Sequence, residues 1–139
     1  MKGTELRGRI LIASPRDKVR AACDQLATSG GYLVLANFES GREMLQAAPS
    51  LQADLALVDG KMEGGEGIQV GESLSAILPT ILILSPKQLE NMTVAEGGDN
   101  RYYVGLHFSK KAILQTMDFA LETARRMGAL KAEMEALRR

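Results

Sequence analysis

Short, mainly apolar runs alternate with longer amphipathic segments along this chain. The runs fall at residues 10–13, 32–36, 55–58, 80–84 and 102–106. Continuous apolar runs of this length are typical of strands buried on both faces of a parallel sheet. The chain between successive runs is too long for a hairpin and must cross over the sheet. The sequence therefore predicts a doubly wound α/β domain with a five-stranded parallel sheet.

Helix signals lie between the runs. Ser14-Pro15-Arg16-Asp17 offers a capping hydroxyl, a proline suited to the first helical position and a carboxylate three residues after the cap, so a helix is expected from there to about Thr28. The other expected helices cover residues 40–48, 68–78 and 109–139, with one or two turns between 85 and 101.

A glycine-rich loop follows the third run. Residues 60–67 contain four glycines, so the backbone there must bend sharply or approach another segment closely. A phosphate-binding fingerprint would need a different glycine order and a closing Lys-Ser or Lys-Thr pair. A nucleotide site is therefore only weakly supported.

Composition limits the classes of partner. The 139 residues suit one compact domain, and 17 basic and 17 acidic residues give a net charge of zero. No global field would recruit nucleic acid or an anionic membrane, and no apolar stretch is long enough to span a bilayer. The lone Cys23 sits in an apolar periodic stretch and is expected to be a buried hydrophobe in a reducing, cytoplasmic setting.

Polar side chains are expected to gather at the carboxyl ends of the strands, where doubly wound sheets carry their sites. Ser14 and Pro15 follow the first run, Asp59 ends the third and Ser85 ends the fourth. His107 follows the fifth. Asp59 is thus the acidic residue around which a site is predicted.

The order of these segments resembles the receiver domain of two-component response regulators. The likeness covers about residues 9–121 and rests on the segments 56–62, 65–68, 81–85 and 103–109. It implies a flavodoxin-like, receiver-like sheet, with Asp59 as the candidate phosphoacceptor. It also implies that Ser85 is the switch hydroxyl and that Tyr103 is the coupled switch aromatic.

The sequence departs from the receiver pattern where charge is needed. Ser14 and Pro15 stand where such a domain carries the acidic pair for magnesium, Leu106 replaces the expected lysine, and His107 replaces the proline beside it. One missing electrostatic group typically costs about 3–4 kcal/mol in a transition state. A degenerate pocket is therefore predicted, with no catalytic residue, no metal ligand and no cofactor.

Each candidate residue also has a structural interpretation. Asp59 could cap the glycine loop, Ser14 is primarily a helix cap, and Tyr103 is as consistent with sheet packing as with a switch. A lone histidine such as His107 is more often structural than a ligand. The lysines flanking the pocket, Lys61 and Lys87, are ordinary solvated side chains on this view.

The last predicted helix is longer than the sheet it would cover, at about 46 Å for 31 residues. Met127, Leu130, Met134 and Leu137 recur at spacings of three, four and three, as in a coiled-coil seam, and Glu133 and Arg138 could pair across a parallel dimer. We therefore expect a receiver-like domain over residues 1–126, with residues 127–139 as a dimerising helix or a linker to an output domain.

The combined expectation is a non-enzymatic, receiver-like signalling module that works through protein contacts, including a histidine kinase or an output domain, without direct contact to nucleic acid or membrane. Three alternatives remain. They are an ordinary receiver phosphorylated at Asp59, the receiver part of a transcription antiterminator with an RNA-binding output, and a small-molecule-binding domain on a flavodoxin-like sheet.

Overall fold

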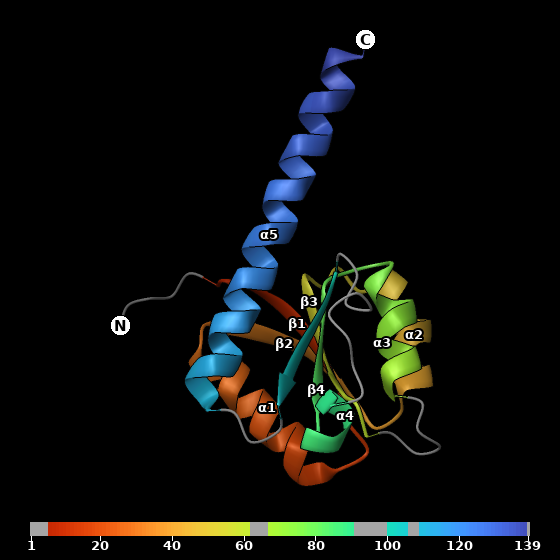
Figure 1. The fold of residues 1–139 in the computed structure, drawn as a ribbon, viewed down its shortest axis with the longest axis vertical. Helices are drawn as coiled ribbons and strands as arrows, with labels where there is room; N and C mark the ends of the chain where they lie inside the picture. Colours follow the sequence, from red (N-terminus) through yellow and green to blue (C-terminus); the bar gives the residue numbers. More distant parts are fainter. Residues whose placement is uncertain (1–5, 62–66, 91–99, 106–108, 139) are drawn as a thin grey trace.

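The computed structural model describes residues 6–61, 67–90, 100–105 and 109–138. Five parallel strands form one sheet in the order β2-β1-β3-β4-β5, which confirms the predicted doubly wound architecture (Figure 1). The strands are β1 (Gly8–Ala13), β2 (Tyr32–Phe38), β3 (Leu55–Asp59), β4 (Thr80–Leu84) and β5 (Arg101–Gly105).

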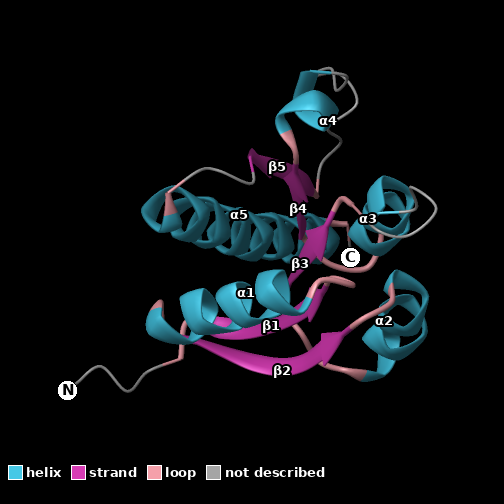
Figure 2. Ribbon diagram, turned by 90° about the horizontal axis from the view of Figure 1, so that it is seen from below, coloured by secondary structure: helices cyan, strands magenta, loops and turns pink. Residues whose placement is uncertain are grey.

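Helices cover both faces of the sheet (Figure 2). The helices are α1 (Asp17–Ser29), α2 (Gly41–Ala47), α3 (Gly67–Ser75), α4 (Pro86–Glu90) and α5 (Lys110–Leu137), with a 3-10 turn at Ala48–Ser50. Helices α1 and α5 lie on one face, and α2 and α3 lie on the other.

Side chains of each strand alternate between two hydrophobic cores. In β1, Ile10 and Ile12 pack under α1 and α5, whereas Leu11 and Ala13 pack under α2 and α3. All four are at most 1% exposed. This double burial explains why the strands read as continuous apolar runs and not as an alternating pattern.

The start of the first helix differs from the prediction. Helix α1 begins at Asp17, and its N-cap residue is Arg16, whose side chain makes no capping hydrogen bond. The prediction that Ser14 caps this helix is therefore wrong. The hydroxyl of Ser14 donates to Asp59 instead, and the helix begins two residues later than predicted.

Two other caps follow the local signals. Ser40 caps α2 by accepting hydrogen bonds from the main-chain N–H groups of Arg42 and Glu43. Ser109 caps α5 by accepting from Ala112 N. The third predicted helix ends earlier than expected, at Ser75, because the chain turns there towards β4.

Helix α5 extends well beyond the sheet (Figure 1). Every described residue from 125 to 138 is exposed. The helix leaves the body at the end opposite to the carboxyl ends of the strands, where Asp59 lies. Within the described ranges, no helix combines the length and apolar character needed to cross a membrane.

Candidate functional site

Asp59 is the last residue of β3, and its neighbours in the sheet are β1 and β4. The residue is 1% exposed, although it carries a carboxylate. Burial of a charge is costly unless the charge is paired and hydrogen-bonded, so its partners define the chemistry of the site.

Each of the two carboxylate oxygens of Asp59 accepts two hydrogen bonds. Oδ2 accepts from Ser14 Oγ at 2.7 Å and from Arg16 Nε at 2.9 Å. Oδ1 accepts from Arg16 Nη2 at 2.8 Å and from the main-chain N–H of Lys61 at 2.9 Å. The Arg16 guanidinium therefore grips the carboxylate with two parallel bonds, the geometry that gives arginine–carboxylate pairs their strength.

The path of the chain after β1 sets up this grip. Arg16 has an extended backbone with φ −98° and ψ 117°, and its N–H donates to Ser14 Oγ at 3.0 Å. The same hydroxyl donates to Asp59, so Ser14 links the turn to the carboxylate. The Ser14 carbonyl in turn accepts a hydrogen bond from Arg20 Nη1 at 2.7 Å. The Arg16 guanidinium thus contacts Asp59 directly, and the Arg20 guanidinium holds the main chain at Ser14.

The side chains around Asp59 do not suit a magnesium ion. Magnesium prefers several oxygen ligands, and Ser14 and Pro15 supply no carboxylate at the end of β1. Both oxygens of Asp59 are already bound to Arg16. In the part of the chain that the structure describes, no group of three His, Cys, Asp or Glu residues could hold a metal.

Ser85 takes part in a capping box at the start of α4. Its Oγ accepts from Gln88 N at 3.2 Å, and the Gln88 Oε1 accepts from Ser85 N at 3.0 Å. This reciprocal pair satisfies two main-chain donors at the helix end. The switch role of Ser85 remains a prediction, and its hydroxyl has a structural task as well.

The other predicted positions differ in how far they can be described. Tyr103 is half-buried and packs on the α2–α3 side of the sheet. Lys61 and Lys87 have exposed side chains, as the ordinary interpretation expected. Leu106 and His107 lie outside the described residues, so their predicted places in the pocket are not tested.

Cys23 lies on the buried face of α1, and it is 6% exposed. Burial, followed by the charges of Asp59 and Asp24, raises the pKa of its thiol to about 11. The buried-hydrophobe interpretation of this residue is therefore confirmed. A thiol with such a pKa is almost fully protonated near neutral pH and is a poor nucleophile.

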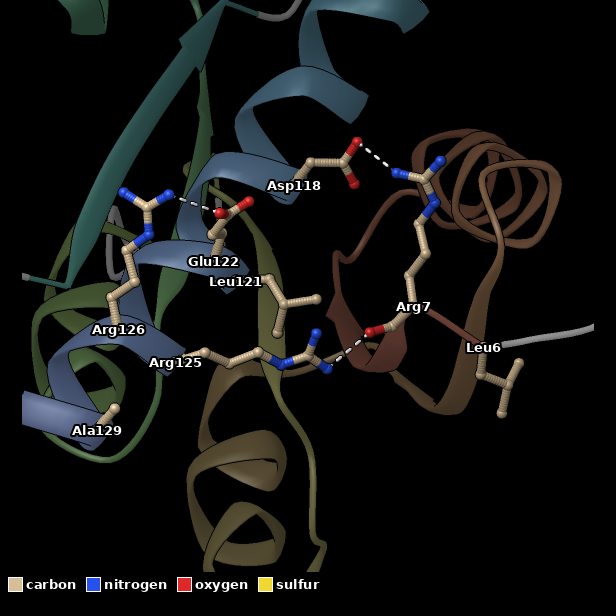
Figure 3. A pocket seen from close by; sticks show the side chains of 8 residues that line it. All are labelled: Leu6, Arg7, Asp118, Leu121, Glu122, Arg125, Arg126 and Ala129. Carbon is tan, nitrogen blue, oxygen red and sulfur yellow. Dashed lines mark hydrogen bonds and ion pairs between the residues drawn. The ribbon is translucent and has the colours of Figure 1, made fainter. Parts of the chain in front are cut away.

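A hollow lies at the base of the α5 extension, away from Asp59 (Figure 3). Arg7 pairs with Asp118 at 2.7 Å, and Arg125 Nη2 donates to the Arg7 carbonyl at 2.9 Å. Burial and a hydrogen bond to Asp118 raise the pKa of Tyr32, whose hydroxyl donates to that carboxylate at 2.5 Å. The contacts fasten α5 to the starts of β1 and β2, which is a structural role.

Sequence reasoning missed Arg16. The available signal was indirect: a buried carboxylate without its acidic neighbours and metal needs another cation, and Arg16 is the first basic residue after the first strand. Neither hydrophobic periodicity nor cap preferences could indicate that this side chain folds back onto Asp59.

Comparison with known proteins places these features in context. No protein-family model matches the chain. The chain is 26% identical to the signal receiver domain of a modulated diguanylate cyclase from Desulfovibrio desulfuricans G20, with a TM-score of 0.77 over 88% of this chain and 99% of that one. This chain is a receiver-like domain. Its fold is also that of a response regulator receiver protein from Burkholderia phymatum (23% identity, TM-score 0.69, 84% and 96% coverage).

The amino-acid sequence is also similar to that of a transcriptional regulator. The transcriptional regulatory protein PdtaR of Mycobacterium tuberculosis is 23% identical over 131 residues. The match includes 93% of this receiver-like domain but 64% of the relative, so the chain spans less than two thirds of that protein's length. The predicted resemblance to response-regulator receivers is therefore confirmed.

Proposed function

We propose that this receiver-like domain transmits signals through protein contacts and not through metal-dependent phosphorylation of Asp59. The observation that carries the proposal is the two-bond pairing of Arg16 with both oxygens of Asp59. The guanidinium supplies the positive charge that a divalent cation would otherwise provide. We assign no catalytic activity to the module and expect it to work in the cytoplasm.

Energetics favour this state over a metal-bound one. A cation would have to displace Arg16, which already neutralises Asp59, so the ion would gain only the difference between its own pairing with the carboxylate and that of the guanidinium. The acidic pair that would increase this gain is absent, since Ser14 and Pro15 stand at the end of β1. Phosphoryl transfer also relies on positioned charge, and each missing group typically removes about 3–4 kcal/mol of stabilisation.

The face formed by α4, β5 and α5 is our candidate for partner contacts. Phe119 of α5 is 62% exposed, and its ring meets that of Tyr102 of β5 edge to face, with centroids 6.0 Å apart. The exposed Phe119 ring, supported by the half-buried Tyr102, gives a partner a large apolar contact at a small cost in side-chain entropy.

We also propose that the α5 extension forms a homodimer. Met127, Leu130 and Met134 are 49–54% exposed, and Leu137 is 85% exposed. These side chains lie on a helix segment that has no sheet to cover, and their heptad spacing suits a second copy of the same helix. Glu133 and Arg138 could then pair between parallel helices.

Acetyl phosphate tests the proposed function directly. The protein is incubated with acetyl phosphate and magnesium, and Asp59 is examined by intact-mass and peptide mass spectrometry. We expect less than a tenth of the protein to be modified, since several transition-state groups are missing. A standard phosphorylatable receiver treated in parallel provides the positive control, and stoichiometric modification of Asp59 would overturn the proposal.

A second candidate function is the receiver part of a longer transcriptional regulator. The curated relative is a transcriptional regulatory protein with more than a third of its length outside the match. An antiterminator with an RNA-binding output after α5 would be one such protein. Sequencing the reading frame past Arg139 tests this candidate, and an immediate stop codon would exclude it.

A further inference from the structure

The Asp59–Gly60 peptide is packed between the starts of two helices. On the α3 side, a Cβ added to Gly67 would lie 2.4 Å from the Gly60 oxygen and 2.7 Å from the Asp59 oxygen, so the two backbones touch without any side chain between them. Gly60 is itself buried, and its N–H donates to the Ile83 carbonyl at 2.8 Å. Little room exists for this peptide to move alone.

On the α4 side, a single side chain makes the connection. Gln88 Nε2 donates to the Gly60 carbonyl at 2.9 Å. The other end of the same amide accepts from Ser85 N, within the capping box. The Gln88 amide group thus joins the first turn of α4 to Gly60, the residue that follows Asp59.

The Ser85 hydroxyl accepts the Gln88 N–H and stabilises the helix end, whereas the Gln88 side chain contacts the peptide that follows Asp59. A buried carbonyl requires a donor, and Gln88 supplies one to Gly60. A displacement of Asp59 would therefore break the Gln88–Gly60 hydrogen bond or move Gln88 with it. The hydrogen bond between Gln88 N and the Ser85 hydroxyl could persist.

We propose that Gln88 is the coupling residue of this domain, carrying changes at the Arg16–Asp59 pair through the Gly60 carbonyl to α4. The inference rests on the proposed function, since it assumes that the ion pair is the element that a partner disturbs. It adds the route by which the disturbance would reach the α4–β5–α5 face.

One substitution separates the coupling bond from the capping box. In Gln88→Glu, a carboxylate oxygen can still accept from Ser85 N, and a negative charge suits a helix N-terminus. The donor to the Gly60 carbonyl is lost. Helix α4 should therefore still form, and only its connection to Asp59 is removed.

The test is a double-mutant comparison by NMR. Arg16→Met is made in the wild-type and in the Gln88→Glu background, and amide shifts are compared between each pair. We expect Arg16→Met to shift the amides of Lys87 and Leu89 in the first background. In the Gln88→Glu background these shifts should fall at least threefold, while shifts at Ser14 and Lys61 persist in both.

Each outcome has a distinct meaning. Equal α4 shifts in both backgrounds would overturn the coupling role of Gln88, as would an absence of α4 shifts when Arg16 is replaced in the wild type. Lys87→Gln, a change at the neighbouring exposed position, is the matched control and should leave the transmitted shifts intact. The acetyl phosphate assay does not depend on Gln88, so failure of the proposed function would be recognised separately.

Discussion

At the scale of single residues, the Arg16 guanidinium pairs with the buried Asp59 carboxylate. Arg16 neutralises Asp59 with two hydrogen bonds, and Ser14 and the Lys61 N–H supply the other two. The position of Asp59 was predictable from the apolar run that it ends. The identity of its partner was not, because the contact depends on the exact path of three residues between β1 and α1.

Replacing Arg16 tests how much the pair stabilises the fold. Arg16→Met leaves a buried carboxylate without its cation, and the expected loss is about 2–3 kcal/mol in the free energy of unfolding, below the range for a fully buried pair. The reduction reflects the Arg16 side chain, which is 37% exposed. Urea unfolding followed by circular dichroism measures the change.

The matched control is Arg126→Met, which removes an exposed ion pair with Glu122 on α5. Such surface pairs contribute about 0–1 kcal/mol, so this variant should unfold close to the wild type. If both substitutions lowered the free energy of unfolding equally, the Arg16–Asp59 pair would stabilise the fold no more than a surface ion pair does.

Cys23 gives a second prediction at this scale. Its pKa of about 11 exceeds the ordinary value of 9.0, so the reactive thiolate is scarcer at pH 8 in the folded chain. The difference lowers the thiolate fraction roughly 100-fold. Iodoacetamide should therefore alkylate the native protein at least that much more slowly than the protein in urea. Comparable rates would contradict the buried, protonated thiol.

At the scale of elements, the strands were predictable and the helix starts were less so. Buried runs identify strands because both faces of the sheet are covered, whereas a cap depends on which partner the side chain finds. The hydroxyls of Ser40 and Ser109 accept hydrogen bonds from the first turns of the helices that follow them. Local preference failed at Ser14, whose hydroxyl donates to Asp59 in the candidate site.

Replacing Gly67 by alanine tests the close packing of the α3 start against the Asp59–Gly60 peptide. In Gly67→Ala the new Cβ would meet the Gly60 carbonyl at 2.4–2.5 Å, and main chain cannot yield cheaply. We expect a loss of about 1–3 kcal/mol, as for other overpacked sites. Chemical unfolding measures it, and a stability within 0.5 kcal/mol of wild type, about the scatter of neutral surface changes, would contradict the packing.

Gly128→Ala is the counterpart on the α5 extension, where nothing lies within 4 Å of the added Cβ. Alanine is favoured over glycine in a helix by about 1 kcal/mol. Amide exchange in the extension should slow accordingly. Unchanged or faster exchange would show that this segment is not helical in solution.

At the scale of the whole molecule, the body and the α5 extension present separate surfaces at opposite ends (Figure 1). The doubly wound fold was predictable from the alternation of apolar runs and helices, since such crossovers admit few topologies. The division between a domain over residues 1–126 and a helix over 127–139 remains a prediction, because α5 runs through that boundary without a break.

Dimerisation through the extension is tested with one charge placed on or off the seam. Leu130→Glu buries a carboxylate between the helices and should convert the dimer to a monomer, as measured by light scattering over a range of concentrations. Ala132→Glu adds the same charge on an exposed position outside the seam and should leave the dimer intact. A wild-type chain that stays monomeric, or identical behaviour of the two variants, would reject this interface.

The most direct test of the account is a crystal structure of the protein soaked with magnesium and beryllium fluoride. The account predicts that the Arg16 guanidinium stays on both oxygens of Asp59, with no ordered cation or fluoride at the carboxylate. An ordered metal ion and a beryllium fluoride group on Asp59, with Arg16 displaced, would contradict it.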